Sequence, residues 1–142
     1  MDLMISPAES DTDLRDCWPV YRQLHAEFDM LGKFVERLQQ VRARGYVLLA
    51  GRVAGRCVVV AGYRLQGNFT HGDFMYVDDL VCDEAERGKG YGARMLAHLR
   101  EEARSNGCAR LLLDSPVNNL LAHRFYWREG MMATAARFTL VL

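Results

Sequence analysis

The sequence predicts a mixed α/β fold, with a mostly antiparallel central sheet, one β-α-β crossover and flanking helices. Short apolar runs separated by glycine-rich turns recur between residues 46 and 82, as in an antiparallel meander. A strand, a long amphipathic helix and a second strand then follow from residue 74 to residue 113, which makes those two strands parallel neighbours. The length of 142 residues suits a single domain, residues 1–142.

The first third of the chain is expected to form a short strand and two helices. Residues 3–5 are the candidate strand, and residues 11–13 are helix-start residues. Pro19 lacks an N–H, so we expect it at the first turn of a helix rather than in the middle of one. A second helix is predicted over residues 33–44. The aromatic and apolar residues at helical spacing in the first helical region are Leu14, Trp18, Tyr21, Leu24 and Phe28.

Seven further elements are predicted from periodicity and turn residues. The helix at residues 92–106 is the clearest, because its apolar residues form one stripe and Gly107 suits the left-handed position that ends a helix. The other helix is expected at residues 118–128. Strands are expected at residues 46–50, 57–63, 74–82, 111–113 and 133–142.

Composition excludes several classes of protein. Lys+Arg and Asp+Glu both number 18, so no nucleic acid or anionic membrane is expected as a partner. No apolar run approaches the roughly 20 residues that span a bilayer, and residues 1–10 do not resemble a signal peptide. We therefore expect a cytoplasmic protein with free thiols. The scattered Cys and His residues show no metal-ligand spacing, so no metal is expected.

A glycine-rich turn joins the predicted strand 74–82 to the helix that follows. It reads Arg87-Gly88-Lys89-Gly90-Tyr91-Gly92, and its glycines allow a close backbone approach to a ligand. A helix N-terminus binds anions through its free N–H groups and its dipole, so a phosphate or pyrophosphate suits this turn. Lys89 is followed by Gly90 rather than Ser or Thr, and Met95 replaces the third glycine, which excludes the Walker and dinucleotide motifs. A plain strand-to-helix turn is the alternative.

A second motif follows downstream, at residues 119–131. It reads Asn119-Leu-Leu-Ala122-His-Arg-Phe125-Tyr126-Trp-Arg-Glu-Gly130-Met131. Together with Arg87, Gly90 and Gly92 in the pattern R-x-x-G-x-G, it resembles the GNAT superfamily of N-acetyltransferases, with Met131 where the family usually has Phe. The resemblance covers residues 46–131.

The resemblance implies a GNAT-type fold and direct transfer of an acetyl group from acetyl-CoA, as co-substrate, to an amine of a small molecule or peptide. It implies that strand 74–82 splays from its parallel neighbour and that the backbone of Leu80, Val81 and Cys82 pairs with the pantetheine arm, much as in strand addition. Tyr126 would protonate the leaving thiolate as general acid, and Asn119 would contact the arm. The residues implied to hold the pyrophosphate are Arg87, Gly88, Lys89, Gly90, Tyr91 and Gly92.

The base is less well defined. Asp78 and Asp79 are adjacent in a predicted strand, where neighbours face opposite ways, so one of them is expected to face the reaction cleft. A structural aspartate is the alternative for each. His71 is a further candidate base, although a surface position is favoured for it. Packing in the core is the alternative for Tyr126, and it is favoured over an acceptor pocket for Trp18, Tyr21 and Phe28. Cys82 is interpreted as a small hydrophobic residue.

Three functions are compatible with this fold. Tyr126 and the aspartates favour an enzyme over a non-catalytic acyl-CoA-binding regulatory or interaction module. A toxin that acetylates aminoacyl-tRNA would usually have a basic surface, which the zero net charge disfavours. The twelve residues after Gly130 suffice for one strand, where family members usually carry two. Because an exposed apolar strand edge is avoided in soluble proteins, we expect a homodimer through this strand, or else a monomer whose N-terminal helices shield it.

Overall fold

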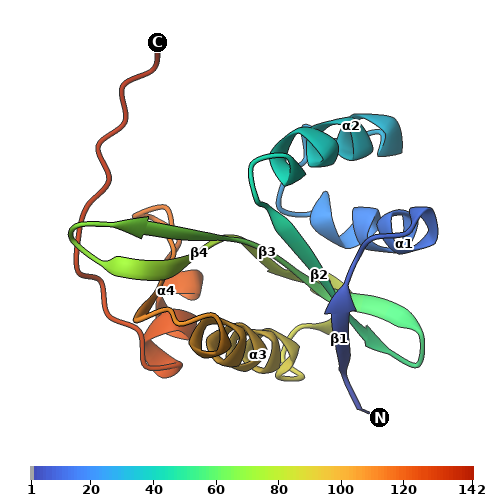
Figure 1. The fold of residues 1–142 in the computed structure, drawn as a ribbon. Coiled ribbons are helices and arrows are strands. Elements are labelled where there is room, and N and C mark those ends of the chain that lie inside the picture. The colour runs from blue at the N-terminus through green and yellow to red at the C-terminus, as the bar shows by residue number, and fades with distance from the viewer. Residues whose placement is uncertain (1) are drawn as a thin grey trace. The chain divides into compact units, whose positions relative to one another are not determined.

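A computed structural model describes residues 2–142 (Figure 1). The chain divides into two units, one that ends at Leu112 and one that comprises Leu113–Leu142. The single domain expected over residues 1–142 stays a prediction, and its first residue, Met1, lies outside the described residues.

The first unit is built on a five-stranded sheet with the order β1-β2-β3-β4-β5. Strands β1 to β4 pair antiparallel, whereas β4 and β5 pair parallel. The predicted mixed sheet and its crossover are therefore confirmed, and each strand predicted before residue 114 is present with shifted ends. The strands are β1 (Met4–Pro7), β2 (Val47–Val53), β3 (Arg56–Asn68), β4 (Gly72–Cys82) and β5 (Arg110–Leu112).

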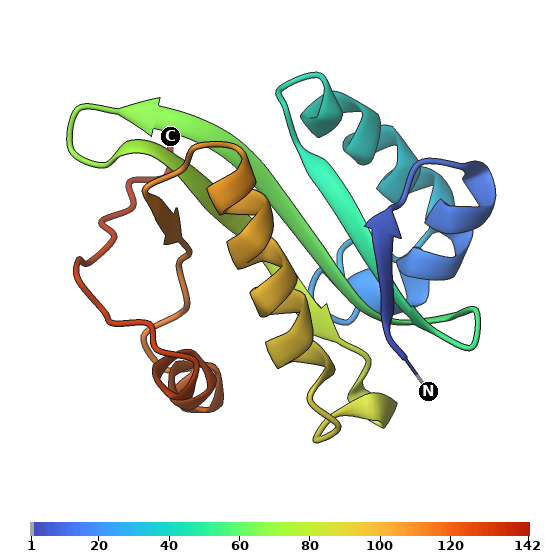
Figure 2. The same cartoon turned by 60° about the horizontal axis from the view of Figure 1, so that its bottom comes forward.

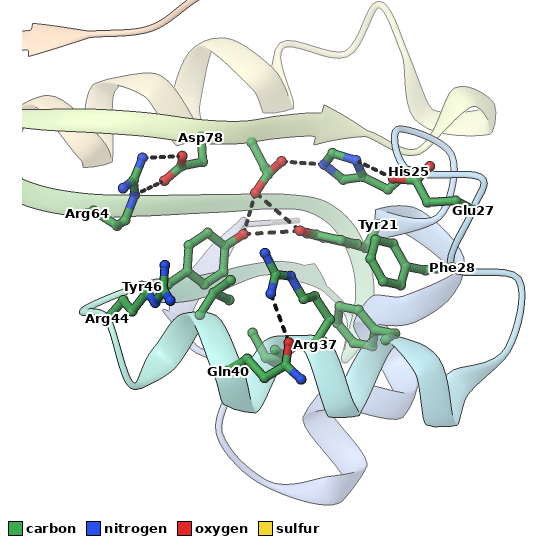
Figure 3. A pocket seen from close by; sticks show the side chains of 14 residues that line it. Tyr21, His25, Glu27, Phe28, Arg37, Gln40, Arg44, Tyr46, Arg64 and Asp78 are labelled. Atoms are coloured by element: carbon green, nitrogen blue, oxygen red, sulfur yellow. Dashed lines mark hydrogen bonds and ion pairs between the residues drawn. The ribbon is translucent and has the colours of Figure 1, made fainter. Parts of the chain in front are cut away.

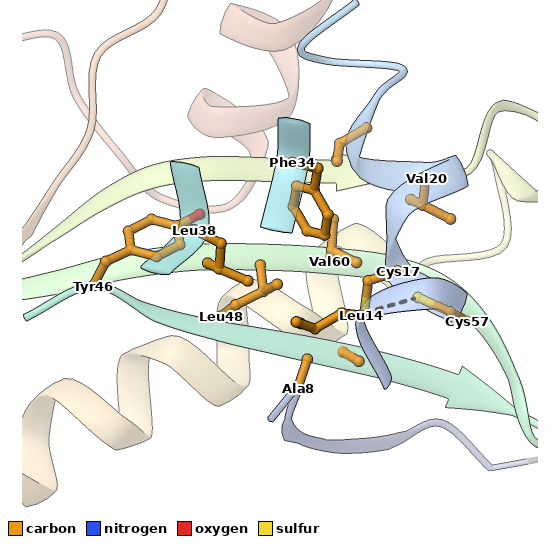
Figure 4. Close-up of a cluster of buried hydrophobic side chains, with 12 residues drawn as sticks. Ala8, Leu14, Cys17, Val20, Phe34, Leu38, Tyr46, Leu48, Cys57 and Val60 are labelled. Atoms are coloured by element: carbon orange, nitrogen blue, oxygen red, sulfur yellow. Dashed lines mark hydrogen bonds between the residues drawn. The ribbon is translucent and has the colours of Figure 1, made fainter. Parts of the chain in front are cut away.

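Helices cover both faces of this sheet. Helices α1 (Asp11–Tyr21) and α2 (Leu31–Arg42) lie on one face, and α3 (Tyr91–Ser105) lies on the other (Figures 1 and 2). Successive residues of β3 alternate between the two faces. Val60 joins the cluster under α1 and α2, which also holds Leu14, Cys17, Phe34, Leu38 and Leu48 (Figure 4). The four cysteines of the chain are free, as predicted.

Helix α1 begins with a capping box. The Ser10 hydroxyl accepts a hydrogen bond from the Asp13 N–H, and the Asp13 carboxylate accepts one from the Ser10 N–H. Pro19 therefore lies near the C-terminal end of α1, and the prediction that it occupies a first turn is wrong. The helix tolerates it because the missing N–H removes a single bond two residues before the helix ends. Phe28 consequently lies beyond the helix.

The second unit contains α4 (Leu120–Arg128), close to the predicted bounds. The Asn119 side chain caps this helix by accepting a hydrogen bond from the Ala122 N–H at 3.2 Å. The predicted strand 133–142 is wrong, because residues 131–142 form neither helix nor strand. Alternating apolar residues favour extended backbone, but a strand also needs a ladder partner, and this segment joins no ladder among the described residues.

Candidate active site

A pocket of about 820 Å³ opens in the first unit between α2, the segment after α1 and strands β3 and β4 (Figure 3). Its size suits a small molecule, since ligand pockets are typically about 300–1,000 Å³. Aromatic and charged side chains line it together. The lining residues are Tyr21, His25, Glu27, Phe28, Phe34, Arg37, Leu38, Gln40, Val41, Arg44, Tyr46, Arg64, Asp78 and Asp79.

Asp79 is the centre of a hydrogen-bonded cluster in this pocket, and only 6% of its surface is exposed. The hydroxyls of Tyr46 and Tyr21 donate to its Oδ2 at 2.5 and 3.2 Å, and His25 Nε2 lies 2.5 Å from its Oδ1. Burial and the nearby Asp79 charge raise the pKa of both tyrosines, so the phenols keep their protons. A buried carboxylate is costly unless it is paired, and these donors supply the pairing.

His25 lies between two carboxylates. Its Nε2 faces Asp79, and its Nδ1 lies 3.3 Å from Oε1 of Glu27, whose side chain is 65% exposed. The hydrogen bond to Asp79 raises the pKa of His25 above its ordinary value of 6.5. The ring is partly accessible from the pocket, so His25 combines a fixed orientation with contact to solvent.

We expect the free energy of unfolding to fall as the pH rises above about 6.5, the ordinary His value. A pKa that is raised in the folded state contributes stability that is complete below the unfolded-state value and is lost as the pH passes the folded-state value. The loss should be roughly 1 kcal/mol, as for a partly exposed charged hydrogen bond. Urea unfolding between pH 5.5 and 9 measures it. His25→Gln should flatten this pH dependence, and His98→Gln, outside the pocket, should not. Equal slopes of the free energy of unfolding against pH in the wild type and both variants would contradict the role of His25.

Asp78 and Asp79 both line the pocket, so the expected alternation between them does not hold. Gly62 of β3 pairs with Asp79, but Tyr63 pairs with Val77, which leaves Asp78 as an extra residue in β4. Such a β-bulge breaks the alternation of side chains. Asp78 accepts two hydrogen bonds from Arg64, both at 2.8 Å. Its charge is therefore matched by a bidentate partner.

The glycine-rich turn lies between the short helix η1 (Glu84–Glu86) and α3. Gly88 and Gly90 have φ values of +80° and +83°, and a Cβ on either would meet nothing within 4 Å. No side chain of residues 2–142 caps the N-terminus of α3, so its first N–H groups stay available. Lys89 Nζ lies 2.5 Å from Oε2 of Glu86, so part of the turn's positive charge is matched within the protein.

Strand β4 has a free backbone edge beside this turn. Strand β5 pairs only with Phe74, Met75 and Tyr76, whereas β4 continues to Cys82. Pairing between the two strands thus ends at Tyr76, and within residues 2–142 the edge at Leu80–Cys82 opposite β3 carries no ladder. The splaying that the resemblance implies stays a prediction. Burial raises the pKa of the Cys82 thiol, which keeps it protonated and fits its interpretation as a small hydrophobic residue.

The structure separates the remaining candidates. His71 does not line the pocket; its Nδ1 lies 2.5 Å from Nη1 of Arg110. Among the three aromatic candidates, Tyr21 and Phe28 line the pocket, whereas Trp18 packs against the core. Tyr126 and Asn119 belong to the second unit. Burial raises the pKa of Tyr126, so its phenol is protonated at neutral pH.

Sequence reasoning missed His25, Tyr46 and Arg64 as pocket residues. His25 follows Tyr21 by four residues, a spacing that could have placed both on one side of a helical turn. Within residues 2–142, no group of three or more His, Cys, Asp or Glu side chains could hold a metal ion. No helix in the same part of the chain is long and apolar enough to cross a membrane.

Comparison with known proteins adds independent findings. The model of the Acetyltransferase (GNAT) family matches residues 10–131. The chain is 36% identical over 81 residues to glucosamine 6-phosphate N-acetyltransferase of Trypanosoma brucei brucei, covering 56% of this chain and 53% of that protein. It is 33% identical over 89 residues to aminoalkylphosphonate N-acetyltransferase of Salmonella typhimurium, covering 62% and 58%. It thus spans little more than half the length of these two relatives.

A solved structure resembles the whole chain. An aminoglycoside N-acetyltransferase in complex with CoA superposes with a TM-score of 0.84 at 12% identity, covering 99% of this chain and 95% of that one. At this level of identity the likeness concerns the fold.

Proposed function

The chain belongs to the acetyltransferase (GNAT) family, and from that premise we propose that it transfers an acetyl group from acetyl-CoA to an amine bound in the pocket of Figure 3. The observation that carries the proposal is the buried Asp79 carboxylate, which orients His25 at the wall of a pocket large enough for a small molecule. The acceptors in the names of the two relatives are a 6-phosphorylated amino sugar and an aminoalkylphosphonate, both small amines.

The turn at residues 87–92 and the free edge of β4 form the proposed acetyl-CoA site. The N–H groups at the start of α3 would hold the pyrophosphate. The open backbone at Leu80–Cys82 would pair with the amides of the pantetheine arm, as an added strand does. The named complex of an aminoglycoside N-acetyltransferase with CoA supports this assignment.

The proposed reaction is a direct attack of the amine nitrogen on the thioester carbonyl carbon. A C–N bond forms, the C–S bond breaks, one proton leaves the nitrogen and one reaches the sulfur. His25 accepts the first proton at Nδ1, while its Nε2–H donates to Asp79. Glu27 is mostly exposed, so it can move aside when the amine enters. Asp78 is a weaker candidate base because Arg64 occupies both of its oxygens.

Tyr126 is proposed to supply the second proton. Its place in the motif at residues 119–131 and its raised pKa, which keeps the phenol protonated, support this role. An unchanged kcat in Tyr126→Phe would instead assign the ring to packing. Asn119 is proposed to contact the pantetheine arm through its amide Nδ2, since its Oδ1 caps α4.

We expect acetyl-CoA to stabilise the folded protein by about 2.7 kcal/mol at a hundredfold excess over Kd. Gly90→Val should abolish the stabilisation by filling the space beside the helix N-terminus. Gly107→Val is the matched control, because Gly107 also has a positive φ, of +76°, and open space around it. Both variants should lose similar stability without ligand, and thermal melting with and without acetyl-CoA measures the difference. Equal ligand shifts in the two variants would contradict the assigned site.

Release of free thiol from acetyl-CoA in the presence of a panel of amines tests the activity itself. Binding of acetyl-CoA without thiol release from any amine would favour the non-catalytic acyl-CoA-binding module. A cytoplasmic location remains a prediction.

The homodimer also remains a proposal. Residues 131–142 form no strand, so the dimer can no longer be argued from an exposed strand edge. The apolar side chains of this segment are exposed, and they could pack against a second copy of the chain. A light-scattering mass near 16.2 kDa would refute the dimer. The exposed apolar residues of this segment are Met132, Phe138, Leu140, Val141 and Leu142.

A further inference from the structure

One face of α2 and of the turn after it forms a wall of the pocket. The lining residues Arg37, Gln40, Val41 and Arg44 follow the spacing i, i+3, i+4 and i+7, which places them on one side of a helical path. Figure 3 shows Arg37 and Arg44 on this side of the pocket, with Asp78 and His25 on the opposite side. The pocket therefore has an arginine wall and an acidic wall.

The basic residues of α2 and of the turn after it differ in their partners. Arg37 donates to the neutral amide oxygen of Gln40 at 2.8 Å, which orients the guanidinium without cancelling its charge. The Arg44 side chain makes no hydrogen bond or ion pair with another described residue; only its backbone N–H donates, to the Val41 carbonyl. The other two basic residues of α2 are engaged: Lys33 pairs with Asp29 at 3.0 Å, and Arg42 donates to the carbonyl of Ala8. Arg37 and Arg44, which line the pocket, therefore have no carboxylate partner among the described residues. Arg42 also lacks one, but it does not line the pocket.

A ligand that matches both walls is an amine with an anionic group at its other end. The amine would lie at the His25–Asp79 pair, and the anion would lie against Arg37 and Arg44. Guanidinium groups bind phosphate and phosphonate oxygens through paired N–H donors, and a tetrahedral dianion offers enough acceptors for two of them. A carboxylate offers two oxygens and one charge, and it satisfies such a pair less fully.

We propose that the acceptor is an amine that carries a phosphate or phosphonate group, and that Arg37 and Arg44 bind this group at the mouth of the pocket. The proposal rests on the proposed acetyl transfer for its amine end, and its anion site can be tested by binding alone. The same two arginines should contribute nothing to acetyl-CoA binding, which is assigned to the α3 N-terminus.

Matched pairs of acceptors test the proposal in the full chain. The pairs are glucosamine 6-phosphate with glucosamine, and 2-aminoethylphosphonate with propylamine; β-alanine serves as the carboxylate analogue. We expect kcat/KM to favour the phosphorus-containing member of a pair by about 10- to 100-fold, the range for hydrogen bonds to charged groups. The ratio should fall towards one in Arg37→Gln/Arg44→Gln. Arg15→Gln, an exposed position outside the pocket, should leave it unchanged.

Calorimetry of the same phosphorus-containing amines separates the two proposals. Binding to the wild type that is lost in the double variant, with an unchanged Kd for acetyl-CoA, supports the anion site even if no amine is acetylated, and only the proposed acetyl transfer would then fail. Three results would each overturn the anion site while leaving acetyl transfer intact. They are equal kcat/KM for the two members of each pair, a kcat/KM for β-alanine equal to that for 2-aminoethylphosphonate, and binding of the phosphorus-containing amines that survives in the double variant.

Discussion

Asp79→Asn is expected to lower kcat for amine acetylation by about 10²–10⁴-fold, the range for loss of acid–base catalysis. The carboxylate holds the Nε2–H of His25 and leaves Nδ1 as the proton acceptor. An amide in its place offers an N–H where Tyr21, Tyr46 or His25 now finds an acceptor. The substitution should also lower the free energy of unfolding by about 1–3 kcal/mol, because it leaves a buried donor unpaired.

The pH dependence separates positioning of His25 from a purely structural role. Asp79 raises the pKa of His25, so His25 should lose its proton at a lower pH in Asp79→Asn. As the pH is increased, the activity that remains in this variant should therefore begin to rise at a lower pH than the activity of the wild type. Asp78→Asn is the matched control, because it loses the ion pair with Arg64 in the same pocket. The pH at which its activity rises should be the same as in the wild type. Steady-state kinetics between pH 5.5 and 9 at saturating acetyl-CoA decide between these roles. If Asp79→Asn is less stable but keeps a normal kcat and the pH–activity profile of the wild type, Asp79 has a structural role only.

The fold could be predicted from the sequence because its signals are local. Turn glycines and short apolar runs mark β2, β3 and β4, and the four-residue apolar stripe marks α3. The turn at residues 87–92 could also be located, since glycine spacing and a following helix suffice to indicate it; the binding of an anion there stays a proposal. These features depend on neighbours within a few residues, and tertiary packing does not override them.

The pocket could not be predicted in the same way, because it depends on contacts between distant segments. Tyr21 and His25 reach Asp79 across more than 50 positions, and neither the helical stripe nor the strand pattern indicates that contact. The bulge at Asp78 is a mismatch of register between β3 and β4 and leaves no mark in either strand alone. For residues 133–142, alternation indicated side-chain faces but said nothing of a ladder partner.

Gly62 of β3 makes room for one member of the hydrogen-bonded cluster around Asp79. A Cβ added to Gly62 would lie 1.7 Å from the hydroxyl oxygen of Tyr46 and 2.2 Å from its Cζ. The Tyr46 ring therefore crosses β3 at Gly62, a position without a side chain, and this crossing brings its hydroxyl to Asp79. Glycine is required here by the close approach of the ring, since its backbone is not left-handed.

Gly62→Ala is therefore expected to displace the Tyr46 ring and to lower the free energy of unfolding by about 2–5 kcal/mol, from overpacking and the lost hydrogen bond to Asp79. The kcat should fall as well, because Asp79 loses a donor. Gly32→Ala, in α2 with nothing within 4 Å, should instead stabilise the protein by about 1 kcal/mol.

Tyr46→Leu should clear space for the new methyl group of Gly62→Ala, so urea unfolding of the double variant should show a favourable coupling of about 0.5–3 kcal/mol. A Gly62→Ala variant as stable as the wild type would contradict the crossing, and strictly additive losses would show that the alanine acts on β3 rather than on the Tyr46 ring.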